Sequence, residues 1–305
     1  MPPISGEPGL YESAALFALS AAFMLALRDT FGRLAVQDIH PVSGSWVTAI
    51  AGLAALGAVS AALGDFRTPL PPTGWPTLYI AIAGVLRITA ARTLILAATK
   101  HIGSARTSAT GATTVFFAAA LGILFLGETI SVYLGAGAIF IFGGSYFIAR
   151  SRSGAAASIS LESQLKGMGL ALMAAICLGV SAVLSRKSIP AFASPKQANL
   201  FATTAGVAAF LPFLWGKTSH FGTWPARTWG LLVLTGTVAT LGVTFVYLAL
   251  ARAPVVFSFT IVQSRPLFVI LIAWLFFQAQ EKINPRVVLG AIAIFIGTVI
   301  LIFIR

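Results

Sequence analysis

The chain has 305 residues, of which 58% are hydrophobic and 9% are charged, and its mean hydropathy is +0.93. A soluble domain carries roughly a quarter of its residues as charged side chains, so this composition excludes an ordinary soluble globular protein. The net charge of +12 would raise nucleic acid as a partner for a soluble chain. Here the lysines and arginines stand mostly in short connections between apolar blocks, where lipid headgroups explain them, and we expect no nucleic-acid partner.

Ten apolar segments follow one another along the chain, each close to the roughly 20 residues that a helix needs to cross the hydrocarbon core. We expect membrane-spanning helices at about 12–36, 42–63, 75–99, 103–126, 130–149, 167–187, 196–215, 228–250, 254–278 and 286–304. The longest connection is rich in Ser, Ala and Gly, which is typical of a flexible linker. The predicted division is a first half at 1–150, a linker at 151–166 and a second half at 167–305.

Other classes of site find no support in the sequence. The single cysteine, Cys177, lies inside an apolar block, so no disulfide forms within the chain. The three histidines (His40, His101, His220) are widely separated, and no metal-ligand spacing or phosphate loop is present. We therefore expect no cofactor and no metal, and the absence of a recognisable acid–base or nucleophile pair argues against an enzyme. No basic n-region marks a cleavable signal peptide.

The two halves repeat one another. Leu96–Lys100 recurs as Leu248–Arg252, Phe116 matches Phe268 at the same offset, and Gly135–Ile141 recurs as Gly290–Ile296. Between these matches Glu128 corresponds to Glu281, and more weakly Arg33 and Pro41 correspond to Lys187 and Pro195. Five spans per half is an odd number, so the halves are expected to lie in opposite orientations. Inverted repeats of this kind are a common plan for secondary transporters, with the binding site near the midplane.

These motifs resemble the EamA family of the drug/metabolite transporter superfamily. The resemblance is carried by the stretch from Leu96 through Leu126-Gly127-Glu128 to Gly144, and by its copy near the C-terminus. It implies ten helices around a central cavity, and family members move amino acids, nucleotide precursors, sugars, organic acids and drugs. The second copy departs from the pattern at Gln278-Ala279-Gln280-Glu281, and Trp46 or Thr48 replaces a frequent arginine early in the second helix. The substrate therefore does not carry over.

Several charged side chains fall inside the predicted spans. Arg87 and Arg265 lie near the middle of the third and ninth spans, Arg92 follows in the third, and Arg28 with Asp29 lies past the middle of the first. A charge at the bilayer centre costs roughly 2.5–3.5 kcal/mol on insertion scales, so these groups are expected to face a cavity or to pair. Asp29 shares a helical face with Arg33, whereas Arg28 and Asp29 are adjacent and are not expected to face each other.

The arginines outnumber the single carboxylate, so positive charge remains after any pairing. A guanidinium matches carboxylate and phosphate geometry, which favours an anionic substrate at Arg87, Arg265, Arg92 and Arg28. The alternative is that these arginines bond backbone carbonyls and brace the helices. Asp29 is expected to act as a counter-ion or, in the second interpretation, as a proton-coupling carboxylate.

Polar residues at comparable depth extend the candidate site. In the ninth span, Gln263 and Ser264 precede Arg265 and Pro266, and a proline kinks a helix and frees backbone carbonyls. A plain kink without a binding role is the alternative. The fourth and eighth spans contribute further candidates, namely Thr107, Ser108, Thr110, Thr113, Thr114, Thr244 and Tyr247.

The sequence thus predicts a secondary transporter, an exporter or exchanger, of a small carboxylate- or phosphate-bearing metabolite or an amino acid, working by alternating access. The alternatives are a broad exporter of neutral or hydrophobic amino acids or drugs, a lipid flippase, and a non-transporting scaffold. Expected partners are the substrate, the lipid bilayer, and a proton or counter-substrate, for a monomer or homodimer. We expect the bacterial inner membrane with both termini on one side, which the resemblance implies is cytoplasmic. The distribution of Lys and Arg leaves this orientation open.

Overall fold

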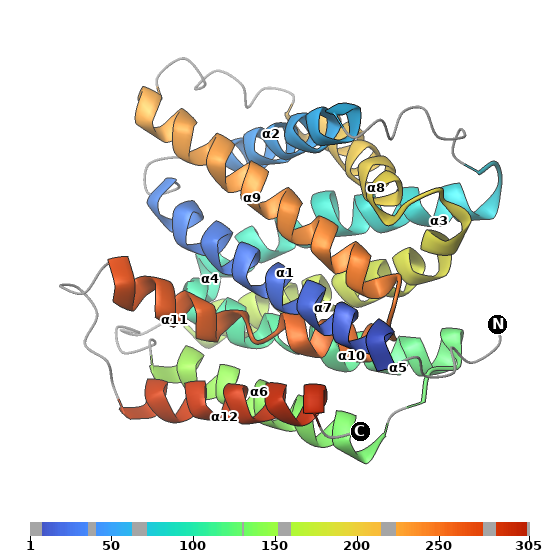
Figure 1. The fold of residues 1–305 in the computed structure, drawn as a ribbon. Helices are drawn as coiled ribbons and strands as arrows, with labels where there is room; N and C mark the ends of the chain where they lie inside the picture. The colour runs from blue at the N-terminus through green and yellow to red at the C-terminus, as the bar shows by residue number, and fades with distance from the viewer. Residues whose placement is uncertain are drawn as a thin grey trace.

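A computed structural model of the chain describes residues 8–35, 41–62, 72–129, 131–151, 160–214, 224–276 and 285–303, and every regular element in these ranges is helical (Figure 1). The elements are, in chain order, α1 (Pro8–Ala35), α2 (Pro41–Ala62), α3 (Trp75–Gly84), the π-helix η2 (Val85–Ala91), α4 (Arg92–Gly111), α5 (Thr114–Leu126), α6 (Val132–Ser151), α7 (Leu161–Ser188), the 3-10 turn η3 (Ile189–Ala191), α8 (Pro195–Phe210), the 3-10 turn η4 (Leu211–Leu214), α9 (Ala226–Leu250), α10 (Val255–Val262), α11 (Arg265–Phe276) and α12 (Pro285–Phe303).

Six helical segments of the described chain are long and apolar enough to cross a membrane. They are Gly9–Gly32, Val42–Ala62, Trp75–Ile102, Leu161–Ala191, Ala226–Leu250 and Val255–Ile272. Shorter apolar helices occur at Thr114–Leu126, Val132–Phe147 and Leu289–Ile302. The chain is therefore a multi-pass integral membrane protein, and the count of ten spans stays a prediction.

Local sequence determines where several helices begin and end. The Ser194 side chain accepts a hydrogen bond from the Gln197 backbone at the start of α8, where Pro195 also fits the first helical position. Pro254 precedes α10 and separates it from α9. Gly127 ends α5 in the left-handed conformation (φ 66°), which glycine adopts without steric cost.

Within α4 the chain turns back, so that it runs along α7 first in one direction and then in the other. Ser181 of α7 donates to the Ala83 carbonyl of α3, Gly167 lies against Ile102 of α4, and Gly179 lies against Phe117 of α5. From residue 83 to residue 102 the chain therefore runs along α7 from residue 181 toward residue 167. From residue 102 to residue 117 it returns toward residue 179. The sequence predicts a connection between two spans at 99–103, where the chain turns back, whereas α4 continues through these residues. No proline occurs there, whereas Pro254 stands at the corresponding position of the second half.

The first helix of each half packs on the third and fourth helical segments of the other half. Helix α1 lies antiparallel to α9, with Phe17 stacked on Phe245 and Gly32 against Thr235 (Figure 1). It lies parallel to α10 and α11, with aromatic pairs at Tyr11–Phe257 and Phe23–Phe268. Helix α7 makes the same two kinds of contact with α3–α4 and with α5.

The second helix of each half crosses the third helix of the other half through glycine. A Cβ on Gly206 of α8 would meet the Gly84 carbonyl oxygen at 2.6 Å, and a Cβ on Gly52 of α2 would meet the Gly236 carbonyl oxygen at 2.8 Å. Gly84 and Gly236 correspond in the register that relates Lys100 to Arg252, and Gly52 and Gly206 in the register that relates Pro41 to Pro195. Small residues allow this close backbone approach, which drives helix association in lipid.

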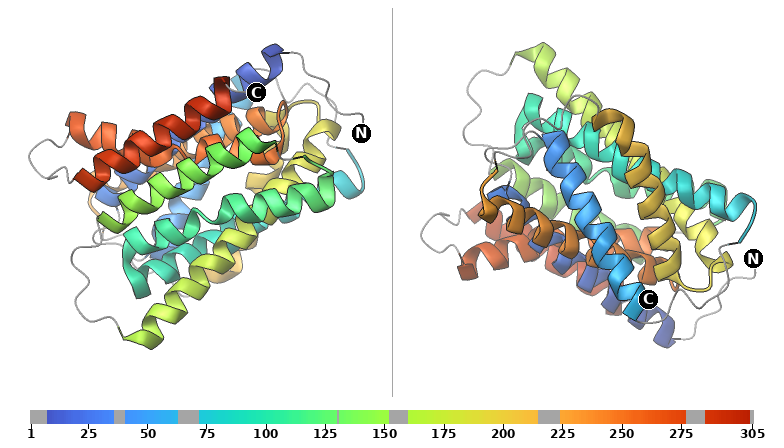
Figure 2. Two further views of the ribbon diagram at one scale, coloured as in Figure 1. Left: turned by 90° about the horizontal axis from the view of Figure 1, so that it is seen from below. Right: turned by 90° about the horizontal axis from the view of Figure 1, so that it is seen from above.

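The last helices of the two halves pack on each other. In α6 and α12 a Cβ on Gly297 would meet the Gly137 carbonyl oxygen at 2.7 Å, and Gly144 lies against Gly290 at the other end of the contact. The two helices are therefore antiparallel. Figures 1 and 2 show this pair at the edge of the molecule, away from α2 and α8.

A carboxylate of the first half caps a helix of the second half. Glu128, which follows the end of α5, accepts hydrogen bonds from the Val255 backbone N–H through Oε1 at 2.8 Å and from the Val256 backbone N–H through Oε2 at 3.3 Å. These two N–H groups lie in the first turn of α10. The N-cap residue of α10, Pro254, forms no side-chain hydrogen bond to them. The charge also complements the positive end of the helix dipole.

Replacing Glu128 by glutamine is expected to destabilise the fold by about 1 kcal/mol, because one strong acceptor and its charge are lost from the α10 cap. The measurement is the thermal unfolding midpoint in detergent. Glu12→Gln, at an exposed position of α1, serves as the control and is expected to leave the midpoint unchanged. Equal midpoints for the two variants would contradict the capping role.

Candidate binding site

The charged residues predicted inside the spans lie on four neighbouring elements. Arg28 and Asp29 lie on α1, Arg92 begins α4, and Arg265 begins α11. Arg87 lies in the π-helix η2, a feature that the sequence analysis did not anticipate. π-Helical turns are rare and occur frequently at functional sites.

The guanidinium of Arg87 is held by neutral groups of the second half. Its Nη2 donates to Asn199 Oδ1 at 3.1 Å and to Thr203 Oγ1 at 3.3 Å, both on α8. Its Cζ lies 5.4 Å from the centre of the Tyr247 ring on α9, within cation–π range. Its Nε is buried and has no hydrogen-bond partner among the described residues.

The groups around Arg87 form a polar network among α7, α8 and α9. Asn199 is fully buried and donates through Nδ2 to Thr244 Oγ1 at 3.0 Å. Tyr247 and Ser185 share a hydrogen bond of 3.0 Å between their hydroxyl groups. The site around Arg87 therefore joins an arginine of the first half to three helices of the second half.

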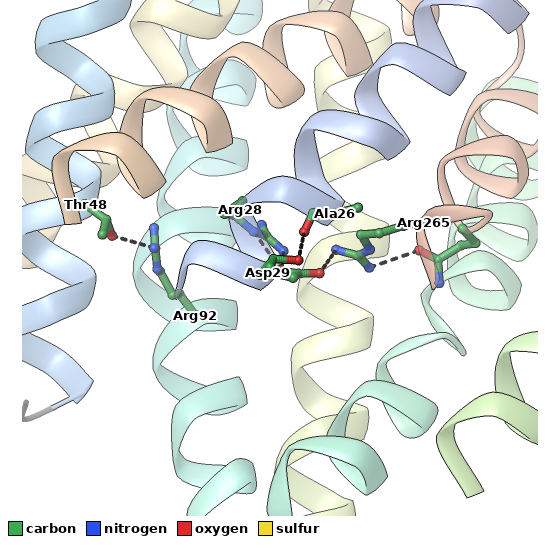
Figure 3. Close-up of polar contacts among 8 residues, drawn as sticks. Ala26, Arg28, Asp29, Thr48, Arg92 and Arg265 are labelled. Atoms are coloured by element: carbon green, nitrogen blue, oxygen red, sulfur yellow. Dashed lines mark hydrogen bonds and ion pairs between the residues drawn. The ribbon is translucent and has the colours of Figure 1, made fainter. Parts of the chain in front are cut away.

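Arg92 makes a separate contact with α2. Its Nη2 donates to Thr48 Oγ1 at 2.6 Å (Figure 3). Arg92 is also close enough to Arg28, Arg87 and Asp29 for electrostatic interaction, in which the two arginines repel it and Asp29 attracts it. Thr48 is one of the two residues that replace the arginine frequent in the second helix of the resembled family, so in this chain α4 provides the arginine beside α2.

Asp29 is the acidic centre of a second cluster (Figure 3). Its Oδ1 lies 2.6 Å from Arg28 Nη2, and its Oδ2 lies 3.7 Å from Arg265 Nη1. Arg265 Nη2 in turn donates to Gln263 Oε1 at 3.4 Å. The side chains of Arg28, Asp29 and Arg265 keep between 28% and 32% of their surface exposed.

The expectation that Arg28 and Asp29 do not face each other is wrong. Both Nε and Nη2 of Arg28 reach Asp29 Oδ1, at 3.0 Å and 2.6 Å. The Cβ directions of adjacent helical residues diverge, but the long arginine side chain bends back across that angle. The predicted Asp29–Arg33 pair involves a side chain of Arg33 that lies outside the described residues.

The structure thus divides the four arginines into two classes. Arg28 and Arg265 share the carboxylate of Asp29. Within the described part of the chain, Arg87 and Arg92 form no ion pair, and their hydrogen-bond partners are amide and hydroxyl oxygens. Uncompensated positive charge is therefore concentrated at Arg87 and Arg92.

The fourth helical segment of each half is interrupted at nearly the same place. Helix α10 ends before Gln263 and Ser264, and α4 ends before Ala112 and Thr113. In the register that relates Phe116 to Phe268, the two breaks are offset by one residue. The sequence predicts the break beside Pro266, and its counterpart after Gly111 was not anticipated.

Some of the polar residues at the two breaks form hydrogen bonds within the protein. The Gln263 carbonyl oxygen lies 3.5 Å from Ser145 Oγ of α6, and the buried Ser264 Oγ has no hydrogen-bond partner in the described residues. Thr110 Oγ1 donates to the Arg106 carbonyl at 3.1 Å and Thr114 Oγ1 to the Gly111 carbonyl at 2.7 Å. The two threonine hydroxyls therefore donate to their own helical segment.

The charges do not follow the internal repeat. In the registers that relate Arg33 to Lys187 and Lys100 to Arg252, each of the four arginines corresponds to an uncharged residue. The pairs are Arg28 with Ala182, Arg87 with Ala239, Arg92 with Thr244, and Arg265 with Thr113. The polar site is asymmetric although the helices around it are arranged as two repeats.

A multi-pass helical membrane protein made of two repeats, with charged and polar side chains brought together from both, belongs to the class of small-molecule transporters. The model of the EamA-like transporter family matches residues 12–150 and again 165–303. The chain is therefore a member of the EamA-like transporter family, and it is a transporter rather than an enzyme.

Two known proteins illustrate the relationship. An uncharacterized transporter in the cobO 3'region of Sinorhizobium sp is 27% identical over 138 residues, which are 45% of this chain and 97% of that protein. A solved crystal structure aligns with a TM-score of 0.73 over 95% of both chains at 17% identity. The first relative has the length of about one repeat, and the second likeness shows the fold alone.

Replacing Asp29 by asparagine is expected to destabilise the protein by about 1–3 kcal/mol, because Arg28 and Arg265 lose their shared carboxylate. The expected loss of stability is smaller than for a fully buried ion pair, because these side chains are partly exposed. The measurement is the unfolding midpoint of Asp29→Asn, Arg265→Gln and the double variant. The pairing predicts that the double variant loses less than the sum of the single losses, and additive losses would contradict it.

Proposed function

We propose that the protein is a secondary transporter, an exporter or exchanger, of a small organic anion that carries a carboxylate or phosphate, amino acids included. The observation that supports this substrate class is the pair Arg87 and Arg92, whose described hydrogen-bond partners are all neutral. Arg265 and Arg28 then serve as a cluster beside the anion site, in which the carboxylate of Asp29 offsets one of their two positive charges.

A guanidinium inside a membrane protein is costly unless its charge is compensated. Asn199 and Thr203 satisfy hydrogen-bonding groups of Arg87 but provide no negative charge. A carboxylate or phosphate provides both, and the planar guanidinium binds either one through two parallel hydrogen bonds. The sum of Arg28, Arg87, Arg92, Arg265 and Asp29 is positive, which favours an anion over a cation.

We propose that the ten predicted spans form two inverted five-helix halves around this site. Helix α1 lies antiparallel to α9, and α7 lies antiparallel to α3, while α2 runs parallel to α9 and α8 runs parallel to α3. This exchange of equivalent contacts supports a two-fold relation between halves of opposite orientation. Sites at such an interface are typical of secondary transporters.

Alternating access is supported by a difference between the two ends of the helix bundle. At one end Glu128 caps α10, Arg186 of α7 donates to the Leu250 carbonyl of α9, and Arg252 stacks on the Phe17 ring. Ala253 and Val255 are fully buried there. Toward the other end, the Asp29 cluster keeps about a third of its surface exposed. We propose that this state is closed at the Glu128 end and that opening there breaks contacts between the halves.

The proposal also covers the membrane, the side of the termini and the coupling partner of the transporter. We place the protein in the bacterial inner membrane with both termini on one side, the cytoplasmic side by family resemblance. Asp29 is assigned the role of counter-ion because two arginines bind it. A counter-substrate is then the favoured coupling partner for an exchanger, since the described membrane interior offers no acidic residue besides Asp29 at this depth.

Counterflow in proteoliposomes with a metabolite panel tests the proposed function. The panel contains carboxylates and phosphate esters together with uncharged amides and alcohols of matched size, with a fluorescent lipid included to report scrambling. Organic anions are expected to exchange and neutral solutes are not. Equal movement of neutral solutes would favour the broad exporter, and lipid scrambling without solute exchange would favour a flippase.

A further inference from the structure

We propose that Asn199 determines the charge selectivity of the Arg87 site. Its amide holds Arg87 in place as a carboxylate would, but leaves the positive charge of Arg87 uncompensated, so that an anionic substrate provides the missing charge. This inference rests on the proposed anion transport and assigns its selectivity to one residue that the sequence analysis did not single out.

The hydrogen bonds of Asn199 fix which way its amide points. Thr244 Oγ1 donates its proton to the Thr240 carbonyl at 2.9 Å, so its oxygen is left as an acceptor. The partner at 3.0 Å must then be the donating Nδ2 of Asn199. Asn199 Oδ1 consequently faces Arg87 Nη2 at 3.1 Å and Thr203 Oγ1 at 3.3 Å. The environment therefore requires a group with one donor and one acceptor, which an amide provides and a carboxylate does not.

The same protein contains the alternative arrangement. Arg265 and Arg28 bind a carboxylate at Asp29, whereas Arg87 binds the isosteric amide at Asn199. Both arrangements satisfy guanidinium donors, and they differ in whether the arginine keeps a net charge available. Arg87 Nε is also buried, and no described residue accepts its hydrogen bond, so a ligand oxygen that reached it would satisfy a donor.

Asn199→Asp is therefore expected to abolish the preference for anions. Opposite unit charges about 4 Å apart attract each other strongly inside a protein, so a carboxylate at this position largely cancels the field of Arg87. We expect the affinity for an anionic ligand to fall by about tenfold to a hundredfold. A neutral ligand of the same shape has no charge to be repelled, so its affinity is expected to stay within about twofold.

The experiment uses purified full-length protein and two ligand pairs matched in shape, namely glutarate with glutaramide and succinate with succinamide. Ligand-induced stabilisation against heat is measured as a function of concentration, at an ionic strength kept constant with sodium chloride. The wild type is expected to be stabilised more by the charged member of each pair, and Asn199→Asp is expected to lose this difference.

A second variant distinguishes an effect of charge from a local folding defect at position 199. Thr203 is 4% exposed and contacts Arg87 from the same helix, so Thr203→Asp is expected to reduce the preference for anions as Asn199→Asp does. Thr203→Asn changes the same side chain without adding a charge, so the difference between the two variants isolates the effect of the charge. A purely structural role of Asn199 would lower the affinity for charged and neutral ligands equally.

The outcomes separate the two proposals. If the wild type prefers the anions and both aspartate variants keep that preference, the assignment to Asn199 is overturned while anion transport stands. If the wild type shows no preference for the charged member of either pair, the anion site itself is overturned and the assignment falls with it.

Discussion

Replacing Arg87 by glutamine is expected to lower transport of an anionic substrate by about a hundredfold, with the protein still folded. Removing one partner of a buried charge pair costs roughly 2–5 kcal/mol, and 1.4 kcal/mol corresponds to a factor of ten. Glutamine keeps a hydrogen-bonding group near Asn199 and Thr203 but removes the charge and the planar fork. The measurement is the initial rate of counterflow in proteoliposomes with equal amounts of folded protein.

Arg227→Gln is the matched control for this variant. Arg227 lies in α9 at an exposed position near the start of the helix, away from the polar network around Arg87. Its replacement removes the same side chain and is expected to leave the rate within about twofold of the wild type. Equal rates for Arg87→Gln and the wild type would contradict the role of Arg87 in binding an anion.

Replacing Gly236 by alanine is expected to destabilise the protein by about 1–3 kcal/mol or to prevent its folding. A Cβ at this position overlaps the backbone carbonyl of Thr48 in α2, and a backbone group cannot turn aside as a flexible side chain does. Overpacking of this kind forces a shift of the helices, which costs typically 1–3 kcal/mol. The measurement is the thermal unfolding midpoint and the yield of monodisperse protein in detergent.

Gly230→Ala provides the control in the same helix. No atom lies within 4 Å of a Cβ built at Gly230, so alanine fits there and is expected to stabilise α9 slightly through its higher helix propensity. Gly84→Ala is expected to match Gly236→Ala, since Gly84 makes the equivalent crossing with α8. A stable Gly236→Ala protein would contradict the close α2–α9 crossing, on which the arrangement of the two halves depends.

The helices were largely predictable because lipid makes the signal simple. A segment of about 20 apolar residues has few structures available in a bilayer other than a helix, and the repeat of Lys100 at Arg252 and of Glu128 at Glu281 supplied the two-part organisation. The π-helix at Val85–Ala91 was not predictable, because a single extra residue in a turn leaves no composition signal in an apolar segment. The break after Gly111 was missed for a similar reason, since no proline marks it.

The charged residues that lie together in the candidate site could be selected from the sequence, but their pairings could not. Charged residues inside apolar segments identified Arg28, Asp29, Arg87, Arg92 and Arg265 as candidates, because a charge in a membrane needs a partner. Which arginine meets Asp29 depends on how α11 packs beside α1, which sequence spacing does not determine. Asn199 was missed because it stands near the start of its predicted span, where a polar residue is expected to meet headgroups; packing of α8 against η2 and α9 buries it instead.

The anion site at Arg87 and Arg92 is tested most directly by locating a bound anion. Crystals grown with bromide give anomalous diffraction that identifies the ion independently of any choice of substrate. The account predicts a bromide peak within hydrogen-bonding distance of Arg87 or Arg92, and its loss in crystals of Arg87→Gln. A peak beside Arg265 and Asp29 with none at Arg87 or Arg92 would contradict the division of the arginines into compensated and uncompensated classes.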